Sequence, residues 1–223
     1  MKSDNYQILN IHNSALNECL AEIRDKAIQT NRPRFRENLR QSGIYCGYEL
    51  SKCMAYESQQ VQTVLGNAEV NLLNEQPVLI PILRAALPFY EGLQSVFPHA
   101  ESGFIGAMRK TTSATTFDIA LDYHALPNLN EREVILIDPM LATGKSIVKT
   151  AQVLIKMYPA IKRFYIVALI SSKEGLQYVK SNLTHEHQIL SAALDGELSA
   201  KSYIVPGLGD AGDLAFGEKQ DLT

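Results

Sequence analysis

Residues 134–158 read VILIDPMLATGKSIVKTAQVLIKMY, and this stretch decides the fold. It opens with four apolar residues, 134–137, which is typical of a strand buried on both faces of a parallel sheet. Pro139 stops the run, residues 141–144 predict a turn, and apolar residues recur at helical spacing from about Lys145 onward. A buried strand that turns directly into a helix predicts an α/β domain.

The turn between this strand and this helix predicts an anion site. Free backbone N–H groups and roughly half a positive charge gather at a helix N-terminus. Thr143 and Ser146 add hydroxyl donors, and Asp138 places a carboxylate at the carboxyl end of the strand. We expect a phosphate on the amides and a sugar diol on the carboxylate. The alternative is an ordinary turn with a polar N-cap, but the coincidence of these groups with Gly144 favours phosphate.

The tripeptide GKS at 144–146 also suggests an ATP-binding P-loop, G-x-x-x-x-G-K-[ST]. That motif requires its first glycine at position 139, which is Pro139 in this chain. Proline has no N–H and cannot join a nest of phosphate donors. The sequence therefore argues against a P-loop nucleotide site.

Four segments resemble one known family. DPMLATG at 138–144 resembles the phosphoribosyl-diphosphate (PRPP) loop of the uracil phosphoribosyltransferases. PILRAAL at 81–87, IGAMR at 105–109 and YIVPGLGDAGD at 203–213 resemble the family's other signatures, in the family's order. The resemblance extends from about Arg24 to Gly217. It implies a type I phosphoribosyltransferase fold and the transfer of phosphoribose from PRPP to uracil, giving UMP and diphosphate.

Size and composition fit one soluble domain spanning 1–223. Of the 223 residues, 46% are hydrophobic and 20% charged, and the net charge of −3 gives no reason to expect a nucleic-acid partner. The cysteines are Cys19, Cys46 and Cys53, an odd number without metal-ligand spacing. The N-terminus has no apolar signal core, and no apolar run approaches the length of a membrane span. We expect a cytoplasmic protein without a membrane partner.

Buried strands are predicted near 78–83, 103–108, 134–138, 164–170 and 188–194, alternating with helices. The expected core, 78–194, is therefore a doubly wound parallel sheet. Helices at 14–30 and about 34–57 form a predicted N-terminal helical arm, 1–57, with a role in packing and assembly. The resemblance implies dimer contacts through this arm, hence a homodimer or higher homo-oligomer. Residues 58–76 depart from the family; Gly66-Asn67 hints at a hairpin, and we assign them no function.

Two arginines follow predicted strands. Arg84 and Arg109 would lie at carboxyl strand ends, where open parallel sheets bind ligands. Guanidinium groups suit bidentate contact with a diphosphate. Residues 110–116, KTTSATT, are small, polar and without periodicity, as in a mobile flap.

Residues 195–217 are the predicted base-binding lid. The segment 203–213 has three glycines and a proline, which predicts neither helix nor strand. Its apolar residues, Ile204, Val205 and Leu208, favour a packed lid over a flat ligand rather than a free surface loop. His185-Glu186-His187 has no third ligand nearby and is interpreted as a solvated loop.

The resemblance also implies roles for individual residues. The catalytic set would be Arg84, Arg109, Asp138 and Asp210. The PRPP-binding set would be Arg84, Arg109, Asp138, Pro139, Met140, Leu141, Ala142, Thr143, Gly144, Lys145, Ser146 and Asp210. Uracil would be bound by Asp210 and by backbone groups at Ile204, Gly209 and Ala211. Mg²⁺ would bind through the substrate diphosphate and water, with no direct protein ligand. No histidine lies in these motifs, so no general base is named.

Two alternatives stay open. Ala86, Lys110 and Lys145 depart from the family pattern, as they would in a PRPP-binding regulatory protein or a catalytically weakened paralogue. The second alternative is a phosphoribosyltransferase that acts on a base other than uracil. For Lys145, a positive φ would bring strain, whereas a first helical position would accommodate the side chain. The helical pattern from Ser146 onward favours the helical position.

Overall fold

The computed structural model describes residues 5–111 and 117–219, and the side chains of 107–111 and 117–122 are not described. The elements in chain order are β1 (Tyr6–Ile8), the 3-10 helix η1 (Leu9–Ile11), α1 (Leu16–Arg24), α2 (Arg32–Ser51), β2 (Tyr56–Gln62), β3 (Asn67–Leu73), β4 (Val78–Leu83), α3 (Leu87–Val96), β5 (Glu101–Ser102), β6 (Phe104–Thr111), β7 (Phe117–Ala125), β8 (Glu133–Ile137), β9 (Met140–Leu141), α4 (Lys145–Met157), β10 (Arg163–Ser172), α5 (Lys173–Asn182), β11 (His187–Asp195), β12 (Glu197–Leu198), β13 (Ile204–Val205) and α6 (Ala211–Phe216).

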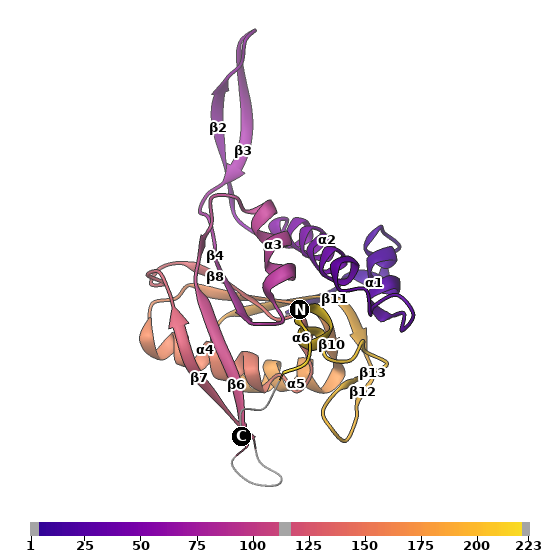
Figure 1. Cartoon of the computed structure of the whole chain (residues 1–223). Helices are drawn as coiled ribbons and strands as arrows, with labels where there is room; N and C mark the ends of the chain where they lie inside the picture. The colour runs from indigo at the N-terminus through magenta and orange to yellow at the C-terminus, as the bar shows by residue number, and fades with distance from the viewer. Residues whose placement is uncertain (1–4, 112–116, 220–223) are drawn as a thin grey trace.

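The central sheet has the strand order β1-β11-β10-β8-β4-β6-β7 (Figure 1). All neighbours along this path are parallel except β6 and β7, which form an antiparallel pair. The chain runs from β4 outward to β6 and β7, then returns to β8 and continues outward through β10 to β11. The winding direction therefore reverses between β4 and β8. This is the doubly wound sheet that the sequence predicts.

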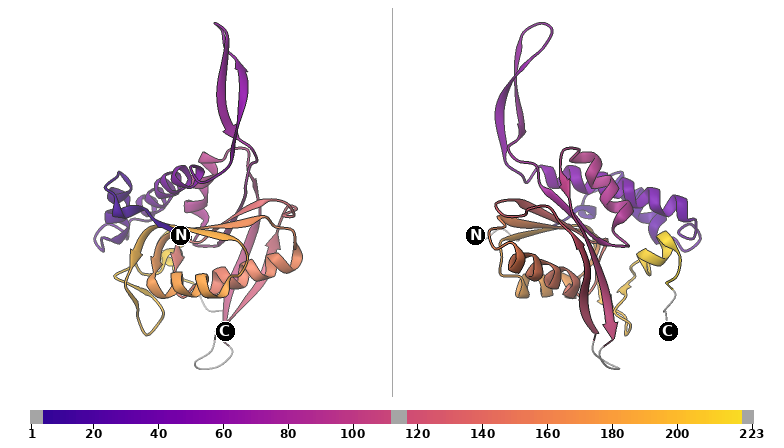
Figure 2. Two further views of the ribbon diagram at one scale, coloured as in Figure 1. Left: turned by 180° about the vertical axis from the view of Figure 1, so that it is seen from behind. Right: turned by 60° about the vertical axis from the view of Figure 1, so that its left-hand side comes forward.

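Helices cover both faces of the sheet, as the two views in Figure 2 show. In β8, the side chains of Ile135 and Ile137 pack into the hydrophobic core that includes α1, α2 and α3. Val134 and Leu136 alternate with them and join the core under α4 and α5. All four side chains are fully buried. The unbroken apolar run in the sequence is thus explained by burial on both faces.

Helices α2 and α3 touch through glycines. A Cβ on Gly43 would lie 2.1 Å from the carbonyl oxygen of Phe89, and one on Gly92 would lie 2.0 Å from that of Arg40. The two backbones are therefore in direct contact, closer than any side chain would allow. Cys46, one turn along α2, is fully buried on the same side.

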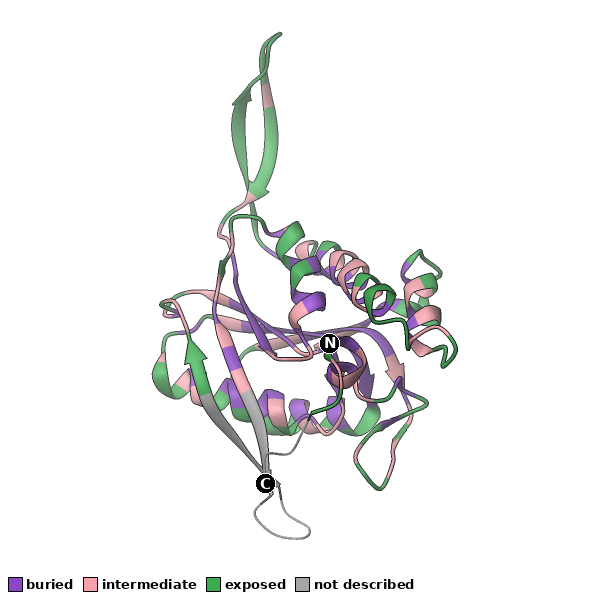
Figure 3. Cartoon of the chain, in the orientation of Figure 1, coloured by how far each residue is buried: buried purple, intermediate pink, exposed green. Residues whose placement is uncertain are grey.

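The hairpin β2–β3 projects from the body of the molecule and is exposed along nearly its whole length (Figures 1 and 3). Its cross-strand register places Val61 opposite Ala68, with Val70 and Leu72 on the same face. The other face carries polar pairs such as Ser58 and Asn71. The projecting ribbon therefore has an apolar patch on the face that also carries Glu57 and Gln59, and no part of the chain that the structure describes covers this patch. The hint of a hairpin at Gly66-Asn67 is confirmed.

Several predicted boundaries are wrong. The helix predicted over 14–30 is α1, which ends at Arg24 because Asp25 turns extended and its carboxylate accepts from the amide of Ala27 at 2.7 Å. The helix predicted over 34–57 is α2, which ends at Ser51. Tyr56 already belongs to β2, because the sequence beyond α2 has no helical apolar stripe to bury. Strand β1, which pairs with β11 at the sheet edge, was not predicted.

None of the described helices is long and apolar enough to cross a membrane.

Candidate functional site

The point at which the sheet reverses direction places two predicted site residues close together in the fold. Pro81 of β4 and Ile137 of β8 are register partners. Arg84 follows the end of β4, and Asp138 follows the end of β8, so both lie at the carboxyl edge beside the switch point. Ligands of open α/β sheets bind in the crevice at this place.

Residues 138–146, which we call the phosphate loop, are held chiefly by backbone hydrogen bonds. The carbonyl oxygen of Pro139 accepts from the amides of Leu169 and Ile170 at 3.1 and 2.9 Å. The short strand β9 pairs in parallel with the end of β10. The carboxylate of Asp138 accepts from the amide of Met140 at 3.1 Å, which orients this side chain at the crevice edge.

Helix α5 closes on the loop through a glycine. A Cβ on Gly175 would lie 2.3 Å from the carbonyl oxygen of Ala142, so only glycine allows this approach. Ser172 caps α5 by accepting from the amide of Gly175, and its hydroxyl donates to the same Ala142 oxygen at 2.6 Å. The loop is thereby fixed against both β10 and α5.

Gly144 and Lys145 form the start of α4. Gly144 has φ +74°, a conformation that favours glycine, and Lys145 is the first helical residue. The prediction that Lys145 occupies the helix start is confirmed. Its side chain is exposed, and its amide lies 3.4 Å from the hydroxyl oxygen of Thr143. The first amides of this 13-residue helix, together with Thr143 and Ser146, can bind a phosphate.

Arg84 is oriented by the lid. Its Nη2 donates to Asp213 Oδ1 and to the carbonyl oxygen of Gly217, both at 2.7 Å. Its Nε is buried without a hydrogen-bond partner among the described residues. The Leu83–Arg84 peptide bond is cis. Ala86, one of the predicted departures from the family pattern, is fully buried with a helical φ of −73° as N-cap of α3, so this position does not require glycine.

The lid contains regular structure, so the prediction of neither helix nor strand for 203–213 is wrong in part. Residues 204–205 form β13, which pairs with β12, and α6 begins at Ala211. Asp210 is the N-cap of α6, and its carboxylate accepts from the amide of Asp213 at 2.9 Å. The cap explains why a glycine-containing segment becomes helical here.

Asp210 and Arg84 come together around Gly212. A Cβ on Gly212 would lie 3.2 Å from Asp210 Oδ1 and 3.7 Å from Arg84 Nε. The predicted uracil-binding positions follow the same segment: Ile204 and Ala211 are buried, and Gly209 is exposed with φ +96°.

Four residues that hold the lid were not predicted as site residues. Arg24 binds Asp195 through two hydrogen bonds, Arg36 donates to the carbonyl oxygen of Ala215 at 2.8 Å, and Asp213 binds Arg84. The two arm residues, Arg24 and Arg36, are about 170–180 positions from their partners, which no local pattern could indicate. The position of Asp195 at the end of a core strand was the one usable signal.

Arg109 does not lie at a strand end, because β6 continues to Thr111. The strand was predicted to stop at 108; the antiparallel pairing with β7 extends it. The side chain of Arg109 and the predicted flap residues 112–116 lie outside the described part of the chain, as do the side chains of Lys110 and Thr111.

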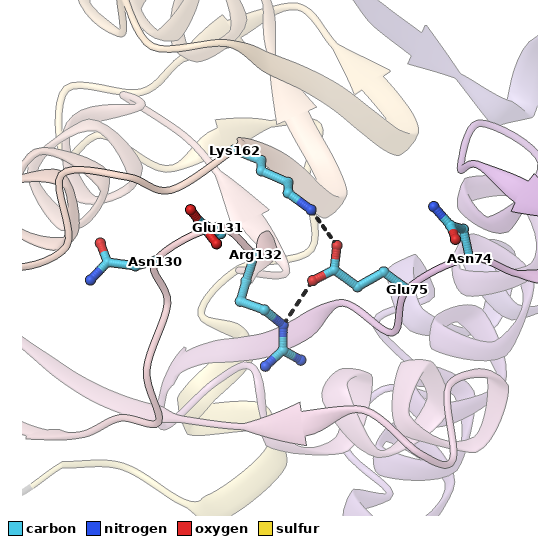
Figure 4. Close-up of a pocket in the computed structure, with 6 residues that line it drawn as sticks. All are labelled: Asn74, Glu75, Asn130, Glu131, Arg132 and Lys162. Carbon is cyan, nitrogen blue, oxygen red and sulfur yellow. Dashed lines mark hydrogen bonds and ion pairs between the residues drawn. The ribbon is translucent and has the colours of Figure 1, made fainter.

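The crevice is distinct from a polar hollow at the opposite edge of the sheet (Figure 4). Its lining residues, from the amino ends of β4, β8 and β10, are Asn74, Glu75, Asn130, Glu131, Arg132 and Lys162. Glu75 forms ion pairs with Lys162 and Arg132, as Figure 4 shows, so the charges there are largely balanced. Parallel α/β sheets carry their sites at the carboxyl edge, and we assign no function to this hollow.

Within the described residues, no group of three or more His, Cys, Asp or Glu side chains could hold a metal ion. His185 stacks edge-on against Phe164, and His187 Nδ1 lies 2.8 Å from the carbonyl oxygen of His185. Residues 185 and 186 lie in the loop before β11, whereas His187 is the first residue of that strand, so the interpretation of 185–187 as a loop is wrong at His187.

A doubly wound sheet with a phosphate loop after β8, an arginine after β4 and a lid over the carboxyl edge defines a type I phosphoribosyltransferase. The family model described as uracil phosphoribosyltransferase matches residues 10–218, and the chain belongs to the uracil phosphoribosyltransferase family.

Two relatives and one solved structure support this. The uracil phosphoribosyltransferase of Porphyromonas gingivalis is 41% identical, covering 95% of this chain and 97% of its own. The uracil phosphoribosyltransferase of Pyrococcus furiosus is 40% identical, covering 92% of this chain and 88% of its own. The AQ2163 protein of Aquifex aeolicus superimposes with a TM-score of 0.83 at 31% identity, covering 95% and 98% of the two chains.

Proposed function

We propose that this chain is a pyrimidine-salvage enzyme that transfers phosphoribose from PRPP to uracil, giving UMP and diphosphate. The observation that carries the proposal is the family match over residues 10–218. The position of the phosphate loop and Arg84 at the two sides of the switch point agrees with it. The whole chain, 1–223, would act as one domain, with 1–57 as helical arm, 78–194 as core and 195–217 as lid.

In the reaction the bond between ribose C1 and the diphosphate oxygen breaks, and a bond from uracil N1 to C1 forms. The diphosphate leaves with the electron pair, and the N1 proton is released. An oxocarbenium-like state lies between, so the protein must hold both reactants in line and stabilise departing negative charge. No general base is assigned.

The proposed roles in PRPP binding follow the geometry of the loop. The amides and hydroxyls of 143–146 would hold the 5′-phosphate, with 139–142 forming the backbone wall of the loop. Asp138 would accept from the ribose hydroxyls. Arg84 would neutralise the leaving diphosphate. Arg109 would do the same, because it lies in the IGAMR segment that resembles a family signature.

Mg²⁺ would reach this site as a substrate-bound ion, held by the diphosphate oxygens and water. Mg²⁺ dehydrates reluctantly and commonly binds proteins together with substrate phosphates. The carboxylate of Asp210 would face PRPP through water. When bound, the ion supplies charge neutralisation of the diphosphate.

Base selection would come from fixed backbone groups. Uracil presents an acceptor, O4, beside a donor, N3–H, and cytosine reverses both. Backbone groups at Ile204, Gly209 and Ala211 that pair with uracil would be opposed by cytosine. Mismatched buried polar groups can discriminate by about 10⁴–10⁵-fold.

The test is turnover of purified protein with PRPP, Mg²⁺ and uracil, with cytosine, orotate and hypoxanthine at matched concentration. We expect UMP, and little product from the other bases. Faster turnover of another base would defeat the base assignment. Tight PRPP binding without UMP formation would favour the regulatory or weakened paralogue, for which Ala86, Lys110 and Lys145 are the sequence argument.

A homodimer or higher homo-oligomer is also part of the proposal. The exposed apolar face of the β2–β3 hairpin and its tip, where Val64 and Leu65 are almost fully exposed, supports it. A two-stranded ribbon with one apolar face is only marginally stable in water by itself. Sedimentation of V64D/L65D, with Gln60→Asp on the polar face as control, is the test. A monomeric wild-type chain would contradict it.

A cytoplasmic location and the lack of nucleic-acid and membrane partners complete the proposal. Their support is the small-molecule chemistry of the site, the net charge of −3 and the free state of all three cysteines.

A further inference from the structure

Arg24, the last residue of helix α1, binds Asp195 at the start of the lid. Its Nη1 lies 2.7 Å from Asp195 Oδ2, and its Nη2 lies 2.9 Å from Asp195 Oδ1, which makes a bidentate pair. Figure 1 shows α1 at the side of the molecule where β11 ends and the lid begins. The pair therefore connects the arm to the first residue of the lid.

The same pair holds one glycine of the lid at both of its polar backbone groups. The amide of Gly207 donates to Asp195 Oδ2 at 2.9 Å, and its carbonyl oxygen accepts from Arg24 Nη1 at 3.2 Å. Gly207 has φ +55°, and a Cβ there would lie 2.1 Å from the carbonyl oxygen of Ile204. The tight turn at Gly207 thus has its amide and carbonyl bound by two charged side chains.

Burial strengthens this arrangement. The side chain of Asp195 is 8% exposed and that of Arg24 is 24% exposed. Hydrogen bonds to charged groups are stronger than those between neutral groups, and a low local dielectric strengthens them further. A second ion pair of α1, between Glu22 and Arg34 of α2, lies at the surface and makes no hydrogen bond to the lid among the described residues.

We propose that Arg24 and Asp195 are positioning residues for base recognition, which determine the placement of the Gly207 peptide and with it the backbone of 204–209. This inference rests on the proposed function, because the lid backbone is the proposed uracil site. The two side chains do not touch the base. They set the direction of the backbone groups at Ile204 and Gly209, three positions before and two positions after Gly207.

Loss of this pair should affect uracil binding and not PRPP binding. A misplaced lid changes the base site, whereas the phosphate loop has no contact with Arg24 or Asp195 among the described hydrogen bonds. Arg24→Ala should therefore raise the KM for uracil by about 10- to 100-fold, the cost of a misplacement of about 1 Å, and leave the KM for PRPP within twofold. Discrimination against cytosine should fall in the same variant.

Two further variants separate positioning from simple loss of stability. Arg24→Lys keeps the positive charge but loses the bidentate geometry of the guanidinium group. Its uracil KM should therefore lie between those of Arg24→Ala and the wild type. R24A/D195N removes the unpaired buried carboxylate that Arg24→Ala leaves behind. Positioning predicts that its uracil KM stays raised even where its melting temperature returns toward the wild-type value. Arg34→Ala, which removes the neighbouring surface pair, should leave both KM values unchanged.

A readout without turnover tests the anchoring by itself. Lys201 is exposed in the loop between β12 and β13. Limited trypsin digestion should cut after Lys201 faster in Arg24→Ala than in Arg34→Ala or wild type.

Parallel rises in both KM values, or restoration of the uracil KM in R24A/D195N, would overturn the proposal. So would an unchanged uracil KM together with an unchanged rate of cleavage at Lys201. A wild-type chain that makes no UMP would defeat the proposed function, and the trypsin arm would still decide whether Arg24 anchors the lid.

Discussion

The phosphate loop and the lid border one crevice, but different forces hold them in place. The phosphate loop is fixed by backbone hydrogen bonds to β10 and by the close approach of Gly175. The lid is fixed by three arginine side chains, two from the arm and one from the end of β4. We infer that the phosphate half of the site is a property of the sheet, whereas the base half depends on the arm.

The largest effect is expected where the phosphate loop meets α5. Gly175→Val should cost about 1–3 kcal/mol of stability and abolish tight PRPP binding, because its Cβ has no room beside the Ala142 carbonyl. Thermal unfolding and PRPP titration measure the two effects. Gly196→Ala is the control, since a Cβ there meets nothing closer than 3.9 Å. An unaffected Gly175→Val protein would show that the loop does not depend on α5.

This contrast also explains what could be predicted from the sequence. The phosphate loop depends on short-range features, namely the apolar run 134–137, Pro139 and Gly144, so strand, turn and helix start could all be predicted, including the helical position of Lys145. The lid depends on Arg24 and Arg36, whose partners lie about 170–180 residues away. Its composition alone suggested irregular backbone, and the cap at Asp210 that starts α6 was missed.

The next effect belongs to the lid. Gly207→Ala introduces a side chain at positive φ, which costs roughly 1–2 kcal/mol before any clash is counted. We expect kcat/KM for uracil to fall by about tenfold or more, while the KM for PRPP stays near its wild-type value. Steady-state kinetics with each substrate varied in turn is the measurement. A PRPP defect of equal size would remove the distinction between the two halves.

A smaller effect should follow from Arg36→Ala. This change removes one hydrogen bond from a charged donor to the Ala215 carbonyl. Bonds of this class are worth about 1.5–3 kcal/mol, and the partial exposure of Arg36 to solvent weakens this one. The KM for uracil should rise several-fold. Arg40→Ala, which breaks a surface pair with Glu37 on the same helix, is the matched control and should change neither KM. Equal behaviour of the two variants would argue against a role of the arm in base binding.

The smallest effect is expected at Lys145. Its exposed charge at the helix start lies near the proposed phosphate, and an ion pair between solvent-exposed groups is worth about 0.2–1 kcal/mol. Lys145→Gly should therefore weaken PRPP binding about two- to fivefold and keep turnover. If turnover rose by orders of magnitude instead, the native chain would be a weakened enzyme.

The contact of α2 and α3 through Gly43 and Gly92 has a consequence for thiol chemistry. Helix α2 cannot shift on α3 without separating two backbones, so Cys46 beneath it should meet solvent only when the domain unfolds. Burial raises the pKa of the Cys46 thiol far above its usual range, which leaves almost no reactive thiolate at pH 8. Burial also raises the pKa of Cys19, less strongly, whereas Cys53 is exposed. Iodoacetamide should alkylate Cys53 first, Cys19 later, and Cys46 at the rate of global unfolding. The rate at which the mass shift appears at Cys46 should therefore measure the rate of global unfolding.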